Sequence, residues 1–144
     1  MATKLVTVEA KQIEGYKIEA KCRNHVSLID QPEASGGTNS GPTPLEYLFI
    51  SLASCIVTIG HIAAKQQRLE VRGIEVKVEG ELNPDVFLGK TKEDRAGFSS
   101  IRVYTKIDAD MTKAEKEKFI KEVDARCPIS DNVHNLTAVE FFVE

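Results

Sequence analysis

The chain has 144 residues, a net charge of −3, 42% apolar residues and three cysteines. This length is typical of one domain, so we expect a single domain over residues 1–144. The slightly acidic balance gives no electrostatic reason to expect a nucleic-acid partner. Three cysteines are too few for a disulfide scaffold. Because no basic-then-apolar N-terminal segment resembles a secretion signal, we expect a cytoplasmic protein.

Three short strands are predicted before residue 31. Leu5 to Ala10 alternates apolar with polar residues, Tyr16 to Cys22 does the same after Gly15, and His25 to Asp30 is a third extended piece. Alternation interrupted by a glycine is typical of antiparallel strands with one solvent-facing side. Residues 31–44 are rich in glycine and proline and are expected to form a loop.

The longest helix is expected over residues 43–67. Thr43 and Glu46 form an S/T-x-x-E capping box, and Pro44 suits the first helical position. Apolar or small residues lie on every face, so either the sheet wraps this helix or a second copy of the protein covers its far side. The segment is long enough to span a membrane. Polar residues such as His61 dilute it and no aromatic belt or basic loop flanks it, so we expect no membrane span.

The second half of the chain predicts further strands and helices. They are a strand at Ile74–Glu79, a loop over 83–99, a strand at Ile101–Asp108, a helix from the capping box of Thr112 and Glu115 to Arg126, a short helix-like run over 129–133, and a strand at Leu136–Val143. This order of elements indicates an α+β fold, with antiparallel sheets packed around a long buried central helix.

The cysteines are the candidate reactive residues. Cys55 lies mid-helix among apolar residues, where it is either an inert core residue or an active thiol. Cys127 precedes Pro128 and a helix-like run, whose free N–H groups favour a thiolate. The position of Cys127 in the apolar spacing of the preceding helix also suits the last apolar residue of that helix. Cys22 is in register with the apolar residues of its strand and indicates packing. No metal site is expected, because Cys22 and His25 point to opposite faces of a strand.

Three segments, CRNHVSLID, SGGTNSGPTPLEYLFISLASC and ARCPISDNV, resemble the OsmC/Ohr family of hydroperoxide-reducing proteins. The most specific marks are Pro44, eleven residues before Cys55, and the late pair of Cys127 and Pro128. The resemblance spans nearly the whole chain. It implies the OsmC-like fold, an intertwined homodimer, and a thiol-dependent peroxidase without a cofactor.

The resemblance also implies roles for four residues. Cys55 matches the attacking cysteine, Cys127 the resolving cysteine that closes an intramolecular disulfide, and Arg23 the arginine that holds the first thiolate. Better-known members place a glutamate directly after the proline, where this chain has Leu45. Glu46 therefore either replaces that glutamate and orients Arg23 or only caps the helix. The implied partners are an organic hydroperoxide and a dithiol reductant.

Helix geometry adds a condition to these roles. Glu46 and Cys55 are nine residues apart, which is about half a turn of rotation on an ideal helix. If Glu46 serves the site, it must therefore reach Cys55 from the other subunit of a dimer. A competing interpretation is a non-catalytic dimer that binds a small apolar ligand and uses its cysteines only for packing.

Overall fold

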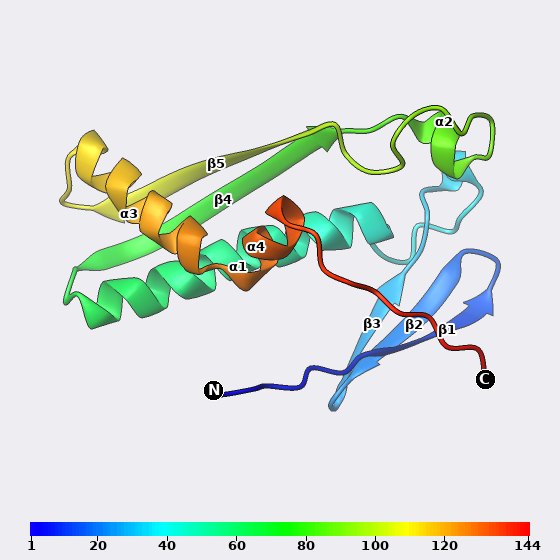
Figure 1. Cartoon of the computed structure of the whole chain (residues 1–144), viewed down its shortest axis with the longest axis horizontal. Coiled ribbons are helices and arrows are strands. Elements are labelled where there is room, and N and C mark those ends of the chain that lie inside the picture. The colour runs from blue at the N-terminus through cyan, green and yellow to red at the C-terminus, as the bar shows by residue number, and fades with distance from the viewer. The chain divides into compact units, whose positions relative to one another are not determined.

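The protein is described here by a computed structural model that covers residues 1–144 (Figure 1). The residues group into two compact units, Met1–Leu48 and Phe49–Glu144. The boundary falls inside the long helix α1 (Pro44–Gln66). The single domain expected from the chain length stays a prediction.

The first unit contains a three-stranded antiparallel sheet in the order β1–β2–β3. Its strands are β1 (Glu9–Glu14), β2 (Lys17–Cys22) and β3 (His25–Ile29). Gly15 joins the first two strands at φ +57°, a left-handed conformation that glycine adopts without a steric penalty. The predicted meander of three short antiparallel strands is confirmed.

The position of the first strand differs from the prediction. The alternation placed it at Leu5–Ala10, whereas β1 begins at Glu9. Glu9 pairs with Lys21 near the end of β2, and the chain then turns at Arg23 toward β3. Residues before Glu9 therefore run past the end of β2 and find no backbone partner there. Strand pairing, rather than side-chain alternation, decides where β1 lies.

The loop after β3 is organised around one buried carboxylate, that of Asp30, which is 1% exposed. Its oxygens accept hydrogen bonds from the backbone N–H groups of Gln31, Thr38 and Ser40, at 2.8, 3.1 and 3.1 Å, and from the Thr38 hydroxyl at 2.6 Å. The Thr38 hydroxyl contributes most to holding the pKa of Asp30 well below its usual range. A Cβ at Gly37 would stand 2.1 Å from a backbone carbonyl oxygen, so this position requires glycine.

The remaining elements follow the loop. They are a 3₁₀ turn η1 (Glu33–Ser35), the helix α1, the strand β4 (Val71–Glu81), the short helix α2 (Pro84–Phe87), the strand β5 (Ser100–Ala109), and the helices α3 (Lys113–Arg126) and α4 (Pro128–His134). The two strands form an antiparallel ribbon in which Ile74 pairs with Ile107. The α+β class with antiparallel sheets is thus confirmed.

Both predicted capping boxes are present. At the start of α1, the Thr43 N–H donates to Glu46 Oε1 at 2.9 Å and the Glu46 N–H donates to Thr43 Oγ1 at 3.2 Å. The same reciprocal pair, at 3.0 and 3.1 Å, joins Thr112 and Glu115 at the start of α3. These bonds satisfy N–H groups that have no partner inside the helix.

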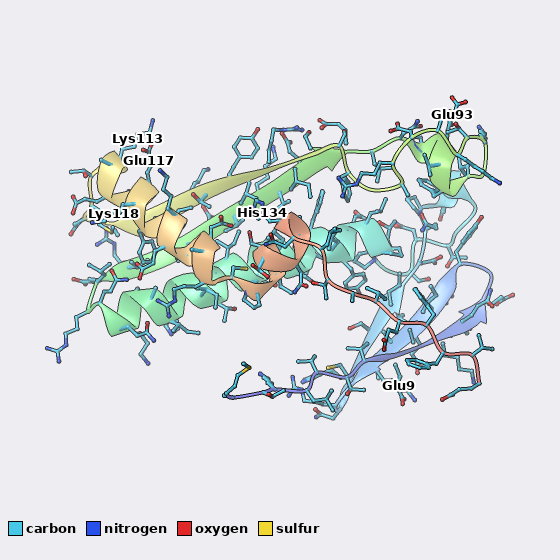
Figure 2. The ribbon with its side chains drawn as sticks, viewed as in Figure 1. Glu9, Glu93, Lys113, Glu117, Lys118 and His134 are labelled. Carbon is cyan, nitrogen blue, oxygen red and sulfur yellow. The ribbon has the colours of Figure 1, made fainter.

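The core of the second unit lies between α1, the β4–β5 ribbon and α3 (Figure 1). Its most buried side chains include Ala63 and Val123, both 0% exposed, and Phe119, 4% exposed. Gly60 lets α1 approach the ribbon, because a Cβ there would stand 2.6 Å from Ile74 Cδ1. The opposite side of α3 is charged and exposed, as Lys113 and Glu117 show (Figure 2).

Helix α1 is buried on one face within this chain, so its own sheet does not wrap it, and cover of its far side by a second copy stays a prediction. The buried residues recur at helical spacing: Leu52, Ile56, Gly60, Ala63 and Ala64. Other apolar side chains of the same helix remain exposed, among them Ile50 at 48% and Ile62 at 38%. By length and composition α1 could cross a membrane, but its buried face belongs to the core of the second unit. One chain therefore covers one face of this helix and leaves apolar side chains exposed on the others.

The predicted C-terminal strand at Leu136–Val143 is not formed, and residues 136–144 have no regular secondary structure. A strand requires a neighbouring backbone to satisfy its N–H and C=O groups, and this segment pairs with no strand of the chain. Its large apolar side chains are exposed, with Phe141 at 92% and Phe142 at 83%.

Candidate active site

Cys55 and Cys127 lie side by side in the second unit. Cys55 is in the middle of α1 and is partly buried, and Cys127 is 1% exposed. The two sulfur atoms are 2.8 Å apart and share a hydrogen bond between thiols. The two cysteines are 72 residues apart in the sequence, so their contact is a product of the tertiary fold.

Cys127 owes its position to the break between two helices. It is the C-cap of α3 and the N-cap of α4, with an extended backbone at φ −81° and ψ 113°. Pro128 requires this conformation, because a proline pushes the preceding residue out of the helical region. The Ser130 N–H then donates to Cys127 Sγ at 3.4 Å, as a helix cap does.

The surroundings of Cys55 favour its neutral thiol. Burial is the main cause that raises the pKa of Cys55, and the hydrogen bond with Cys127 raises it further. The backbone N–H of Ile129, in the first turn of α4, acts in the opposite direction by hydrogen bonding to the sulfur. The donor to this mid-helix cysteine thus comes from a different helix, which periodicity within α1 could not reveal.

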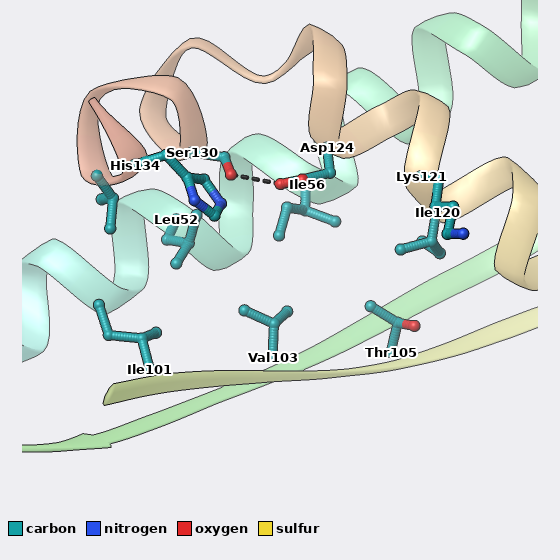
Figure 3. Close-up of a pocket in the computed structure, with 11 residues that line it drawn as sticks. Leu52, Ile56, Ile101, Val103, Thr105, Ile120, Lys121, Asp124, Ser130 and His134 are labelled. Carbon is teal, nitrogen blue, oxygen red and sulfur yellow. Dashed lines mark hydrogen bonds between the residues drawn. The ribbon is translucent and has the colours of Figure 1, made fainter. Parts of the chain in front are cut away.

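A pocket of about 310 Å³ is lined by residues of the same helices that carry the two cysteines, although neither cysteine lines it (Figure 3). It lies between α1, β5, α3 and α4. Its walls are mostly apolar, with Leu52 and Ile56 on the side of α1 and Val103 on the side of β5. Its polar wall contains Ser130 and Asp124, whose hydroxyl and carboxylate are hydrogen bonded. The pocket can take a small, mainly apolar molecule.

Arg23 belongs to the first unit, at the turn between β2 and β3. Its backbone has φ +56°, in the left-handed region that non-glycine residues rarely adopt. Its side chain is exposed. Its predicted contact with Cys55 stays a prediction. Cys22 precedes it in β2 and is a partly buried free thiol.

Glu46 is occupied by the capping box of α1. The hydrogen bond from the Thr43 backbone N–H is the main cause that lowers the pKa of this carboxyl. Its structural role is therefore visible in the structure, and its role in orienting Arg23 stays a prediction. No group of three or more His, Cys, Asp or Glu side chains is placed to hold a metal ion.

The sequence interpretation missed three groups near the cysteines. They are the Ile129 N–H, the Ser130 hydroxyl and the Asp124 carboxylate. The signal that could have indicated the first two is the Cys-Pro-x-Ser order, which places a serine three residues after an N-cap. No local pattern marks Asp124, because it lies on the preceding helix.

Comparison with solved structures shows a shared fold. An OsmC-like protein from Mycoplasma pneumoniae has a TM-score of 0.81 and 19% identity, with 94% of this chain and 91% of that chain covered. An organic hydroperoxide resistance protein OsmC from Legionella pneumophila, a predicted redox protein, has a TM-score of 0.69 and 19% identity, covering 91% of each chain. An organic hydroperoxide resistance protein from Elizabethkingia anophelis has a TM-score of 0.67 and 18% identity, covering 92% and 91%.

At the level of sequence, none of the curated proteins matches the chain. A family model does match, over residues 37–141, and its description is OsmC-like protein. The matched range includes α1 and runs past α4, so it contains both adjoining cysteines. The chain therefore belongs to the family of OsmC-like proteins.

Proposed function

We propose that this protein is a cysteine-based peroxidase that reduces organic hydroperoxides, with Cys55 as the attacking and Cys127 as the resolving cysteine. The observation that carries the proposal is the 2.8 Å contact between their sulfur atoms. The mostly apolar pocket between the same helices suits an organic substrate. Similar folds occur in proteins named for organic hydroperoxide resistance. We also propose that the protein acts in the cytoplasm, where a cellular dithiol would serve as the reductant.

The chemistry proceeds in two steps. The Cys55 thiolate attacks the terminal oxygen of the hydroperoxide, the O–O bond breaks, and the alkoxide takes up a proton to leave as an alcohol. Cys55 is then a sulfenic acid. The Cys127 thiolate attacks its sulfur, an S–S bond forms, and the departing hydroxide takes up a proton as water. An external dithiol reduces the disulfide and is itself oxidised.

The first step requires a thiolate, which the immediate surroundings of Cys55 disfavour. The Ile129 N–H supplies one donor, but burial outweighs it. We propose that Arg23 supplies the missing positive charge, because a guanidinium stays charged at every physiological pH and can offset desolvation. Replacement by alanine should move the pH midpoint of Cys55 alkylation upward. An unchanged pH midpoint and rate of Cys55 alkylation would show that Arg23 does not stabilise the thiolate.

We further propose a homodimer in which Glu46 orients the Arg23 that serves Cys55. Two observations support the assembly: the exposed apolar face of α1 and the unpaired apolar segment at residues 136–143. Exposed apolar surface of this kind marks interaction sites. Glu46 and Cys55 lie on opposite sides of α1, so the acid must come from the second copy. A monomer by light scattering at micromolar concentration would contradict the dimer.

The test of the central proposal is intact-mass analysis after one equivalent of cumene hydroperoxide. The expected product has lost two hydrogens, and peptide mapping should find Cys55 joined to Cys127 with Cys22 free. Cys127→Ser is the matched control and should stop at an oxidised Cys55. A parent protein that gains oxygen only at Cys55, or that does not react, would refute the resolving role of Cys127.

A second function is favoured by one specific observation, the raised pKa of Cys55. An inert thiol beside an apolar pocket also fits a protein that binds a small apolar ligand and uses its cysteines for packing. Alkylation by iodoacetamide at pH 7 separates the two functions. A peroxidase should alkylate at Cys55 faster than the unfolded chain does, whereas a packing cysteine should alkylate more slowly.

A further inference from the structure

One hydrogen bond connects the two helices on either side of Cys127. The Ser130 hydroxyl, in the first turn of α4, donates to the Asp124 carboxylate, in the last turn of α3. Ser130 is 4% exposed, and Asp30 is the only other buried polar residue of the chain. Figure 3 shows this bond at the wall of the pocket. The hydroxyl is buried and its acceptor is a charged side chain on an exposed residue, so the bond is partly shielded from water.

Two further bonds and one neighbouring N–H group make this link relevant to the cysteines. The Cys127 N–H donates to the Asp124 carbonyl oxygen at 3.2 Å. The Ser130 N–H donates to Cys127 Sγ at 3.4 Å. Between them, the Ile129 N–H is the backbone group that lowers the pKa of Cys55. Cys127 and Ile129 thus both lie between Asp124 and Ser130, within the segment whose ends the side-chain bond joins.

We infer that Asp124 and Ser130 are positioning residues that hold Cys127 against Cys55 and so favour closure of their disulfide. The inference rests on the proposed function, since it concerns the resolving step of that reaction. Without the bond, α4 keeps its backbone junction with α3 and the packing of Ile129 against the core, but it loses the side-chain hydrogen bond that joins the two helices. The first turn of α4 is then held less firmly, and the effective concentration of one thiol at the other falls.

The equilibrium with a small dithiol measures this effect directly. Reduced dithiothreitol breaks the Cys55–Cys127 bond and becomes a cyclic disulfide, while the protein gains two thiols. The protein is equilibrated in mixtures of reduced and oxidised dithiothreitol and quenched with acid, and the oxidised fraction is read by intact mass. Cys22→Ser in every variant limits the reaction to the two site cysteines.

Four variants separate positioning from general destabilisation. Ser130→Ala and Asp124→Ala remove the bond and should lower the equilibrium constant for disulfide formation about tenfold, as for one hydrogen bond to a charged acceptor. Asp124→Asn keeps an acceptor oxygen and should stay within about threefold of the parent. Glu117→Ala removes a carboxylate from the exposed side of the same helix and should change nothing. Thermal unfolding of each reduced variant records its stability separately.

The results decide the inference independently of the peroxidase proposal. It is overturned if Ser130→Ala and Asp124→Ala equilibrate like the parent, or if Asp124→Asn falls as far as Asp124→Ala. If Ser130→Ala does not fold, the comparison of the two Asp124 variants decides alone, because that side chain is exposed. A parent that forms the disulfide with dithiothreitol but not with a hydroperoxide refutes the proposed function and leaves the positioning intact.

Discussion

Glu46 has one visible role and one proposed role, and a pair of substitutions separates them. Its carboxylate accepts the Thr43 N–H at 2.9 Å in the capping box of α1. Glutamine can make the same bond, because the capping box accepts Glu or Gln at this position. Alanine cannot. Glu46→Gln therefore removes the charge and keeps the cap, whereas Glu46→Ala removes both.

The expected loss of stability follows from these bonds. Replacing a cap residue such as Thr43 by alanine costs about 1 kcal/mol, with a range of about 0.5–2. Glu46→Ala loses the reciprocal bond and the favourable position of a negative charge at a helix N-terminus, together also about 1 kcal/mol. Glu46→Gln loses only the charge contribution, about 0.3–0.5 kcal/mol for an exposed group. Urea unfolding at pH 7 measures the loss of stability in Thr43→Ala, Glu46→Ala and Glu46→Gln.

The pH dependence of this contribution has a definite sign. Hydrogen bonding with Thr43 lowers the pKa of Glu46 in the folded protein. A lowered carboxyl pKa stabilises the fold above the unfolded value of about 4.3 and loses this contribution as the pH falls. The difference in unfolding free energy between the parent and Glu46→Gln should therefore be present at pH 7, begin to fall below about pH 4.3 and disappear only below the lowered folded-state pKa.

The rate of hydroperoxide reduction tests whether Glu46 orients Arg23. If Glu46 orients Arg23, both substitutions should slow hydroperoxide reduction, and Glu46→Gln should do so with little loss of stability. Glu115→Gln is the matched control, because Glu115 occupies an equivalent capping box on α3 at 3.0 Å. It should reproduce the stability effect and leave activity unchanged. Full activity of Glu46→Gln would refute the electrostatic role, and full stability of Glu46→Ala would refute the capping argument.

Two further predictions concern titrating groups. In Cys127→Ala the pKa of Cys55 should fall below its value in the parent, because the thiol hydrogen bond is lost, but burial should still hold it above the usual cysteine value. The pH profile of iodoacetamide alkylation measures this pKa, and a midpoint above that of the parent would contradict the prediction. Asp30→Asn should lower the urea midpoint at pH 7, because three backbone N–H groups lose a charged acceptor. Since the pKa of Asp30 is held well below its usual range, this difference should begin to shrink as the pH falls below about 3.9 and should keep shrinking at lower pH, and a difference that does not change with pH below about 3.9 would contradict the assignment.

Local sequence patterns were sufficient for the elements whose signals lie within a few residues. The capping boxes at Thr43 and Thr112 predicted the starts of α1 and α3, because a cap bonds to residues within one turn of itself. Pro128 predicted the break that places Cys127 at a helix end, because its ring restricts the residue before it. The family was also evident from short motifs around Cys55 and Cys127.

Only the tertiary structure decided which of these elements meet and which remain without a partner. The start of β1 at Glu9 depends on where β2 ends, and the segment at residues 136–143 stays irregular because no strand pairs with it. The contact of Cys55 with Cys127, and the link from Asp124 to Ser130, join separate helices. Periodicity reports which face of an element is apolar, but it does not say what packs on that face. The physical reason is that backbone pairing and side-chain contacts across the fold depend on the whole chain, whereas caps and turns depend on their immediate neighbours.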